Sequence, residues 1–129
     1  MSIFDEIAER HKAALLVQYG STVSGPTHAA SDVDIGVLYD RPPPSLFDQG
    51  ALIEDLQEQF PGRELDLATL DHADPLFLKK VLESCRLLAG SPRRLAELKI
   101  YAFKRYQDHR RFLPLERAYV DRVLAALGR

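Results

Sequence analysis

The sequence has few sulfur-containing residues and no long apolar segment. It contains one cysteine, Cys85, one methionine and no tryptophan in 129 residues. A single cysteine excludes an internal disulfide framework and a zinc site built from several cysteines. No apolar run approaches the roughly 18 residues of a membrane span, and the first residues form an acidic amphipathic pattern rather than a signal peptide. These absences predict a soluble, cytoplasmic protein that has no membrane partner.

Charge is distributed unevenly along the chain, although the formal net charge is only -2. Residues 1–90 contain 7 Lys or Arg against 15 Asp or Glu, whereas residues 91–129 contain 10 against 4. Two explanations stay open: the basic tail packs on the acidic body, or it meets an acidic partner protein. Direct nucleic-acid binding is not favoured, because the basic residues alternate with good helix formers instead of clustering.

Hydrophobic periodicity predicts an α+β fold, in which a small mixed sheet is flanked by helices. The chain length is that of a single domain, residues 1–129, with an α/β core at 1–90 and a helical tail at 91–129. Inside the expected helix 45–60 we place Phe47, Leu52 and Leu56 against the core. The expected strands are 14–19, 32–39, 64–70 and 85–90, and the expected helices of the core are 3–8, 45–60 and 75–84.

The tail is expected to form two helices separated at a proline. Ser91-Pro92 has the composition of a helix start, and Pro114 should end that helix because proline lacks an N–H donor. Apolar residues occupy more than one side of the first helix, which favours burial on two sides over a partner-binding face of aromatic and Arg residues. The residues concerned are Leu95, Leu98, Ala102 and Tyr106 on one side, and Ile100 and Phe103 on another.

The stretch "YGSTVSGPTHAASDVDIGVLYD", residues 19–40, combines Gly20-Ser21 with Asp32-Val33-Asp34. Side chains two residues apart on a strand share a face, so Asp32 and Asp34 point to one side while Val33 enters the core. Neighbouring carboxylates repel each other unless a cation lies between them, and Mg²⁺ prefers carboxylate and phosphate oxygens. Glycine allows close backbone approach to a phosphate, and serine adds a hydroxyl and an N–H donor. The pattern predicts a magnesium and phosphate site.

Two metal ions that clamp an in-line phosphoryl or nucleotidyl displacement need a third carboxylate. Asp66 is the best candidate, because it lies between Leu65 and Leu67 in a strand where an unpaired carboxylate is costly. Glu64 shares its face and is the reserve candidate. The acids converge only if this strand lies beside the Asp32–Asp34 strand, as strands joined by one helix often do. The competing interpretation is that the aspartates cap a turn or pair with Arg.

On these residues, the sequence resembles the minimal nucleotidyltransferase (MNT) branch of the nucleotidyltransferase-fold superfamily. The resemblance covers the order of elements over residues 1–90 and implies a nucleotidyltransferase fold. It implies that Gly20 and Ser21 bind the nucleotide, and that Asp32, Asp34 and Asp66 are catalytic and hold Mg²⁺. Family members often carry an Arg shortly after Gly-Ser, and here Thr22-Val23-Ser24 intervene instead. Another cation must therefore help to neutralise the triphosphate.

The resemblance also implies an acceptor and a partner. Only 39 residues follow the core, which suggests that the acceptor arrives on a separate protein. Similar stand-alone proteins are antitoxins of HEPN–MNT pairs, which implies AMP transfer from ATP to a tyrosine of a HEPN ribonuclease toxin. Two alternatives stay open: adenylylation of a small-molecule hydroxyl such as an aminoglycoside, and a binding antitoxin that no longer turns over. His28 lies in the expected phosphate turn, where a minor substrate contact is conceivable.

Overall fold

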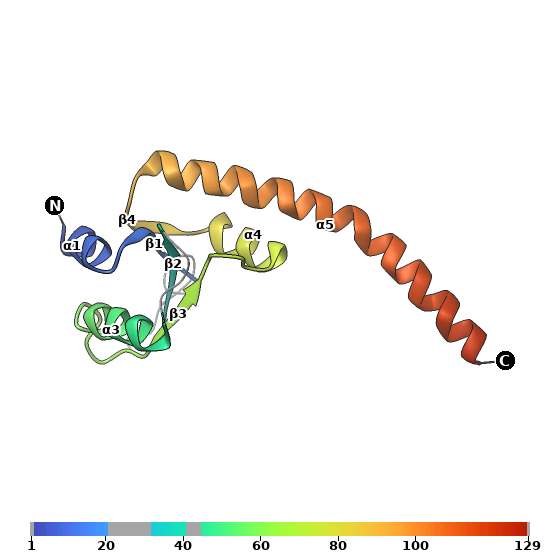
Figure 1. Cartoon of the computed structure of the whole chain (residues 1–129), viewed down its shortest axis with the longest axis horizontal. Coiled ribbons are helices and arrows are strands. Elements are labelled where there is room, and N and C mark those ends of the chain that lie inside the picture. The colour runs from blue at the N-terminus through green and yellow to red at the C-terminus, as the bar shows by residue number, and fades with distance from the viewer. Residues whose placement is uncertain (1, 21–31, 41–44, 129) are drawn as a thin grey trace.

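The computed structural model describes residues 2–20, 32–40 and 45–128, and a four-stranded sheet lies at its centre. The strand order is β3-β2-β1-β4, with β2 and β3 parallel and β1 antiparallel to both of its neighbours. Helices cover both faces of this mixed sheet, which confirms the predicted α+β class (Figure 1). The strands are β1 (Ala13–Tyr19), β2 (Val33–Tyr39), β3 (Leu65–Thr69) and β4 (Arg86–Ala89).

Two hydrophobic clusters, one on each face of the sheet, form the core. Alternate residues of β2 separate the two, because successive side chains of a strand point to opposite faces. Val33 and Ile35 are fully buried in the cluster formed with α1 (Ile3–Arg10) and α3 (Leu46–Gln57). The opposite face of the sheet packs against α4 (Pro75–Glu83) and the beginning of α5 (Pro92–Leu127). The expected inward direction of Val33 is thereby confirmed.

Each helix begins at a side chain that accepts a hydrogen bond from a backbone N–H of the first turn. Such a cap satisfies donors that have no partner within the helix. At α4 and α5 a proline follows the cap, where its missing N–H costs nothing. The capping residues are Ser2, Ser45, Asp74 and Ser91.

A salt-bridged carboxylate joins α1 to α3 at the edge of the first cluster. Asp55 Oδ2 accepts a hydrogen bond from Arg10 Nη1 at 3.1 Å and lies 2.5 Å from His11 Nε2. The hydrogen bonds with His11 and Arg10 and their positive charge lower the pKa of Asp55, against a smaller opposing effect of burial. The contact fixes the approach of the two helices to each other.

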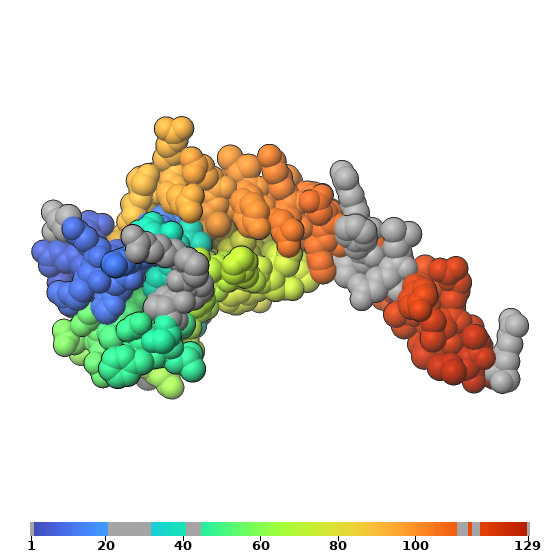
Figure 2. Space-filling model, in the orientation of Figure 1, coloured from blue at the N-terminus to red at the C-terminus, as the bar shows by residue number. Residues whose placement is uncertain are grey.

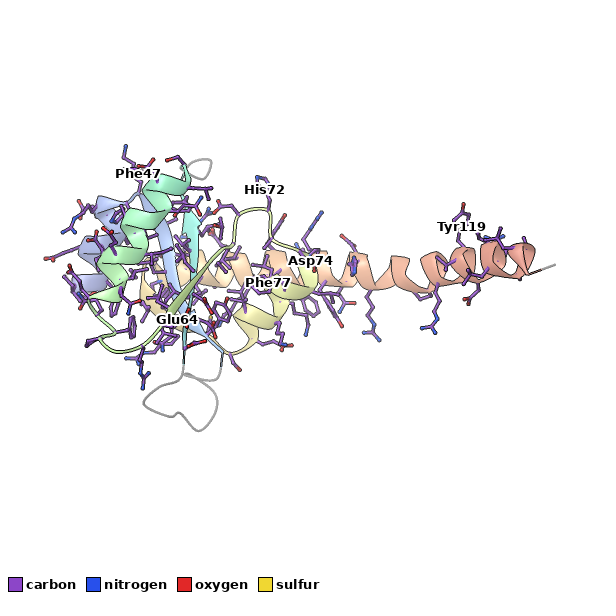
Figure 3. The ribbon with its side chains drawn as sticks, turned by 90° about the horizontal axis from the view of Figure 1, so that it is seen from below. Phe47, Glu64, His72, Asp74, Phe77 and Tyr119 are labelled. Atoms are coloured by element: carbon purple, nitrogen blue, oxygen red, sulfur yellow. The ribbon has the colours of Figure 1, made fainter. Side chains whose placement is uncertain are left out.

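Phe47 does not face the core as expected, because at about 100° per residue it lies on the side of α3 opposite to Leu56. Its side chain is 85% exposed, while Leu52 and Leu56 further along α3 are fully buried. Figure 3 shows Phe47 at the opposite end of the body from Glu64. Leu52 and Leu56 form the buried stripe of α3, and Phe47 lies outside that stripe.

The expected break at Pro114 is wrong, because α5 is one continuous helix of 36 residues. A proline inside a helix removes one backbone hydrogen bond and crowds the preceding turn, and a helix can tolerate this by bending. Figure 1 shows α5 as a long, curved helix that runs along the body and then projects beyond it. Residues 117–128 of α5 are exposed, and Figure 2 shows this part as a rod standing away from the body.

The expectation that α5 is buried on two sides is also wrong. Leu95 and Ala102 are buried against α4 and the sheet, whereas Ile100 and Phe103 are more than half exposed. The first half of α5 therefore has one packed side and one apolar side that faces solvent. None of the helices in the described part of the chain has the length and apolar character that crossing a membrane requires.

Candidate active site

The parallel pairing of β2 and β3 brings two of the predicted site carboxylates together. Asp34 pairs directly with Asp66 in the register, between the pairs Val33–Leu65 and Ile35–Leu67. Directly opposite residues of neighbouring strands project from the same face. Asp34 and Asp66 thus lie side by side on the face of the sheet that α4 and α5 pack against. Asp34 is half-buried but Asp66 is exposed, so the expected cost of burying Asp66 does not arise. The predicted adjacency of the two strands is confirmed.

The pKa of Asp34 is raised, whereas a carboxylate paired with a cation has a lowered pKa. Partial burial raises its pKa, and the negative charges of Asp66 and then Asp32 raise it further. Burial disfavours an ionised carboxylate, and like charges add to that cost. A cation placed between these carboxylates would oppose this rise in the pKa of Asp34, because a nearby positive charge favours the ionised form.

Gly20 ends β1 in a conformation and a position that suit glycine alone. Its φ is +82°, and a Cβ atom built on it would lie 2.4 Å from Oδ2 of Asp34. A side chain at this position would collide with the carboxylate in addition to straining the backbone. The glycine thus allows the backbone after β1 to lie directly against Asp34.

The remaining predicted residues occupy different places. Asp32 is exposed and immediately precedes β2, on the face of Asp34 by the alternation of the strand. Glu64 is exposed and precedes β3, and its backbone oxygen accepts a hydrogen bond from the N–H of Val33 at 2.8 Å. Ser21 and His28 lie outside the described residues.

These carboxylates suit a hard divalent cation in chemistry, although they do not form a closed cage. Mg²⁺ typically takes one or two protein carboxylates and completes its coordination with water and substrate phosphates. In the described residues, no group of three or more His, Cys, Asp and Glu side chains is close enough to hold a metal ion. Asp34 and Asp66, with Asp32 nearby, match the open kind of magnesium site.

A pocket of about 450 Å³ lies between this end of the sheet and α4. The sheet contributes Gly20, Asp34 and Tyr19, whose ring meets that of Phe77 edge to face with centroids 6.1 Å apart. Burial, and then the negative charges of Asp34 and Asp66, raise the pKa of Tyr19, so its phenol is neutral at physiological pH. The other lining residues come from α4 and its C-cap, and they are Phe77, Lys80, Val81, Glu83 and Ser84.

Sequence reasoning missed this helical wall of the pocket. Tyr19 directly precedes Gly20, and its pairing with Asp34 places the two side chains on one face, but only the register of β1 with β2 reveals it. Lys80 is one of two consecutive lysines on α4, and its role depends on how the helix is rotated. No sequence signal distinguished it from Lys79.

Comparison with known proteins gives one family and several similar folds. The family model described as "Nucleotidyltransferase domain" matches residues 1–88. No curated protein matches the chain in sequence. The family match ends inside β4, so it covers the candidate site and all of the sheet except its last residue.

Similar solved structures include chains of toxin–antitoxin complexes. A chain of a mutant MntA–HpeT complex has a TM-score of 0.70 and 20% identity, with 92% of this chain and 94% of that one covered. A chain of a toxin–antitoxin complex with AMP-PNP has a TM-score of 0.70 and 18% identity, covering 95% and 96%. A chain of a complex between the tri-AMPylated Shewanella oneidensis HEPN toxin and the MNT antitoxin has a TM-score of 0.65 and 19% identity, with 92% of this chain and 91% of that one covered. At such identities the likeness concerns the fold. The family match, with the paired carboxylates at its centre, identifies the chain as a member of the nucleotidyltransferase domain family.

Proposed function

We propose that this protein is an antitoxin that transfers AMP from ATP to a tyrosine hydroxyl of a HEPN-type ribonuclease toxin, in the cytoplasm and with Mg²⁺. The observation that carries the proposal is the in-register pair of Asp34 and Asp66 beside a pocket that Gly20 opens. Fold alone does not define an activity, so the argument starts from this site.

Asp34 and Asp66 would hold the metal, with Asp32 as a further ligand from the same face. The metal supplies charge stabilisation for the attacking and leaving oxygens of the displacement. Gly20 leaves room for phosphate oxygens next to Asp34, with Ser21 as the predicted donor from the following residue. In the reaction the hydroxyl oxygen bonds to the α-phosphorus, the bond to the β-phosphate oxygen breaks, pyrophosphate leaves and the hydroxyl proton passes to solvent.

The acceptor is the less direct part of the proposal, and two observations support a protein. Similar folds occur in complexes with a HEPN toxin, one of which is tri-AMPylated. Helix α5 carries apolar side chains that face solvent, and continuous apolar surface of this kind usually marks a partner site. They are Ile100, Tyr101 and Phe103 beside the body, and Tyr119, Val120, Val123, Leu124 and Leu127 on the projecting half.

The basic character of α5 fits an acidic partner surface. Residues 91–129 contain 10 Lys or Arg against 4 Asp or Glu, and much of this charge lies on exposed positions. Arg117 and Arg122 lie on the projecting half of α5, beyond the acidic body, and most of the other basic residues lie on the half that runs along it. Opposite charge would speed association and orient the partner.

Mass spectrometry of intact protein tests the proposal. We expect that purified protein with ATP and Mg²⁺ adds AMP to the separately purified toxin encoded beside it, and that peptide mapping finds the AMP on tyrosine. Addition should stop when Mg²⁺ is chelated. Kanamycin-type compounds modified at rates comparable to the toxin would favour a small-molecule acceptor. Tight binding of the toxin without any mass increase would favour a non-catalytic antitoxin.

A further inference from the structure

Lys80 is a cation in the candidate site that the described chain does not neutralise. It is exposed on α4, lines the pocket with Gly20 and Asp34, and has no ion-pair partner among the described residues. The preceding residue, Lys79, is not part of the pocket lining and does have an ion-pair partner. Lys79 forms an ion pair with Glu83 and lies 4.6 Å from the centre of the Tyr106 ring of α5.

The charge balance of the site calls for such a cation. Asp34 already experiences the negative charges of Asp66 and Asp32, and a triphosphate would add further negative charge next to it. A metal ion offsets part of this charge, and the sequence from Gly20 to Asp32 contains no Lys or Arg that could offset more of it. In the described lining of the pocket, Lys80 is the positively charged residue.

The position of Lys80 also fits a triphosphate. The pocket has Gly20 and Asp34 on its sheet side, whereas Lys80 comes from the helix on the other side. A triphosphate that has its α-phosphate at the carboxylates can extend towards α4. Lysine is a common phosphate ligand because its ammonium group acts as a mobile point charge on a flexible stem.

We propose that Lys80 is the triphosphate-binding cation of this site. Its ammonium group contacts the β- or γ-phosphate of ATP and holds the pyrophosphate part while the α-phosphate reacts. This inference rests on the proposed nucleotide-transfer function but does not depend on which molecule accepts AMP. It predicts that Lys80 discriminates between nucleotides by the length of their phosphate chain.

Calorimetric binding of AMP-PNP and of AMP, both with Mg²⁺ and without any toxin, tests the inference. We expect Lys80→Met to weaken AMP-PNP binding about tenfold or more while changing AMP binding less than about twofold. Lys80→Arg should restore most of the loss, because it returns the charge. Lys79→Met is the matched control: it removes the same charge from the same helix and should leave both affinities within about twofold.

Three results would overturn the assignment of Lys80. They are unchanged AMP-PNP binding in Lys80→Met, an equal loss of AMP and AMP-PNP binding, and an equal loss of AMP-PNP binding in Lys79→Met. Wild-type protein that fails to bind AMP-PNP would overturn both this inference and the proposed function. If Lys80→Met behaves as expected but the toxin is never AMPylated, the proposed acceptor is wrong and Lys80 keeps its role.

Discussion

Asp34 and Asp55 lie in one small fold, but their surroundings are opposite. Asp55 is held by Arg10 and His11, which lower its pKa and tie α1 to α3. Asp34 is bordered by Asp66 and Asp32, and burial together with these like charges raises its pKa. One carboxylate is neutralised by the protein itself, and the other is left for a cation that the protein has to bind.

The difference separates a contribution to stability from a contribution to function. A carboxylate with a cationic partner stabilises the fold when ionised, whereas one surrounded by like charge destabilises it. The register of β2 and β3 imposes the second situation, because it pairs Asp34 with Asp66. Such costs are typically found at functional sites.

Removing the Asp34 carboxylate should reduce activity strongly, whereas removing the Asp55 carboxylate should leave it nearly unchanged. Asp34→Ala or Asp32→Ala should reduce AMP transfer by about 10³-fold, because the metal and the charge it stabilises are lost. Asp55→Asn should leave transfer within about twofold, since Asp55 lies between α1 and α3 and away from the pocket. Radiolabelled AMP transfer to the toxin measures both. Wild-type transfer by Asp34→Ala would refute the site assignment.

The neighbours of Asp34 can be ranked in the same way. Asp66→Asn should lower transfer by about 10²-fold while nucleotide binding through Asp32 and Asp34 persists. Glu64→Gln should change transfer by no more than about threefold. Glu64 precedes β3, and the residue of β3 that pairs with Asp34 is Asp66. Rates at saturating Mg²⁺ and ATP compare the two variants. The reverse ranking would move the third catalytic position to Glu64.

Glycine substitutions test the close approach to Asp34. Gly20→Ala should lose about 1 kcal/mol of stability from its positive φ and also lower transfer about tenfold, because its Cβ displaces the carboxylate. Gly62→Ala is the matched control, since its φ is +77° but nothing lies within 4 Å of the added Cβ. It should show a similar loss of stability without loss of transfer. Chemical denaturation and the transfer assay measure the two effects, and equal transfer in both variants would contradict the steric argument.

The smallest effects are changes in stability of opposite sign. At pH 7 we expect Asp55→Asn to lose about 1 kcal/mol and Asp34→Asn to raise the melting temperature slightly. The folded-state pKa of Asp55 is lowered, so its stabilisation is present above its ordinary pKa and disappears as pH falls through the folded pKa. The folded-state pKa of Asp34 is raised, so its cost develops as pH rises through that range. In melting curves, the difference in melting temperature between each variant and the wild type should therefore be smaller at pH 3 than at pH 7. A destabilised Asp34→Asn at pH 7 would contradict the comparison.

The sequence predicted the strands, because alternation and turn residues are local signals. The adjacency that pairs Asp34 with Asp66 was expected on a different ground, since strands joined by one helix often lie side by side. It did not predict the helical wall of the pocket. Whether Lys79 or Lys80 faces the site depends on how α4 packs on α5, which is a tertiary property. The role of each site residue remains a prediction.

Two errors in the tail have a common physical cause. Pro114 was expected to end a helix, and Ile100 and Phe103 were expected to be buried. Both rested on a local rule, the first on the N–H donor that proline lacks and the second on the pattern of apolar residues. A local rule cannot show that a helix continues past the surface of its own body, since hydrophobic periodicity is the same whether the matching surface belongs to this chain or to another protein.

Because α5 is one continuous helix, it can set the distance between the candidate site and a partner bound to the tail. At about 1.5 Å per residue its 36 residues span about 54 Å, and a partner held on the projecting half would stand at a fixed distance and angle from Asp34. Which tyrosine of that partner reaches the site would then depend on the length of α5 and on the direction in which the partner-binding side of the helix faces. Inserting one alanine after Arg117 would advance everything beyond it by about 1.5 Å and rotate it by about 100°. The choice of acceptor would change while the chemistry of the sheet stayed the same.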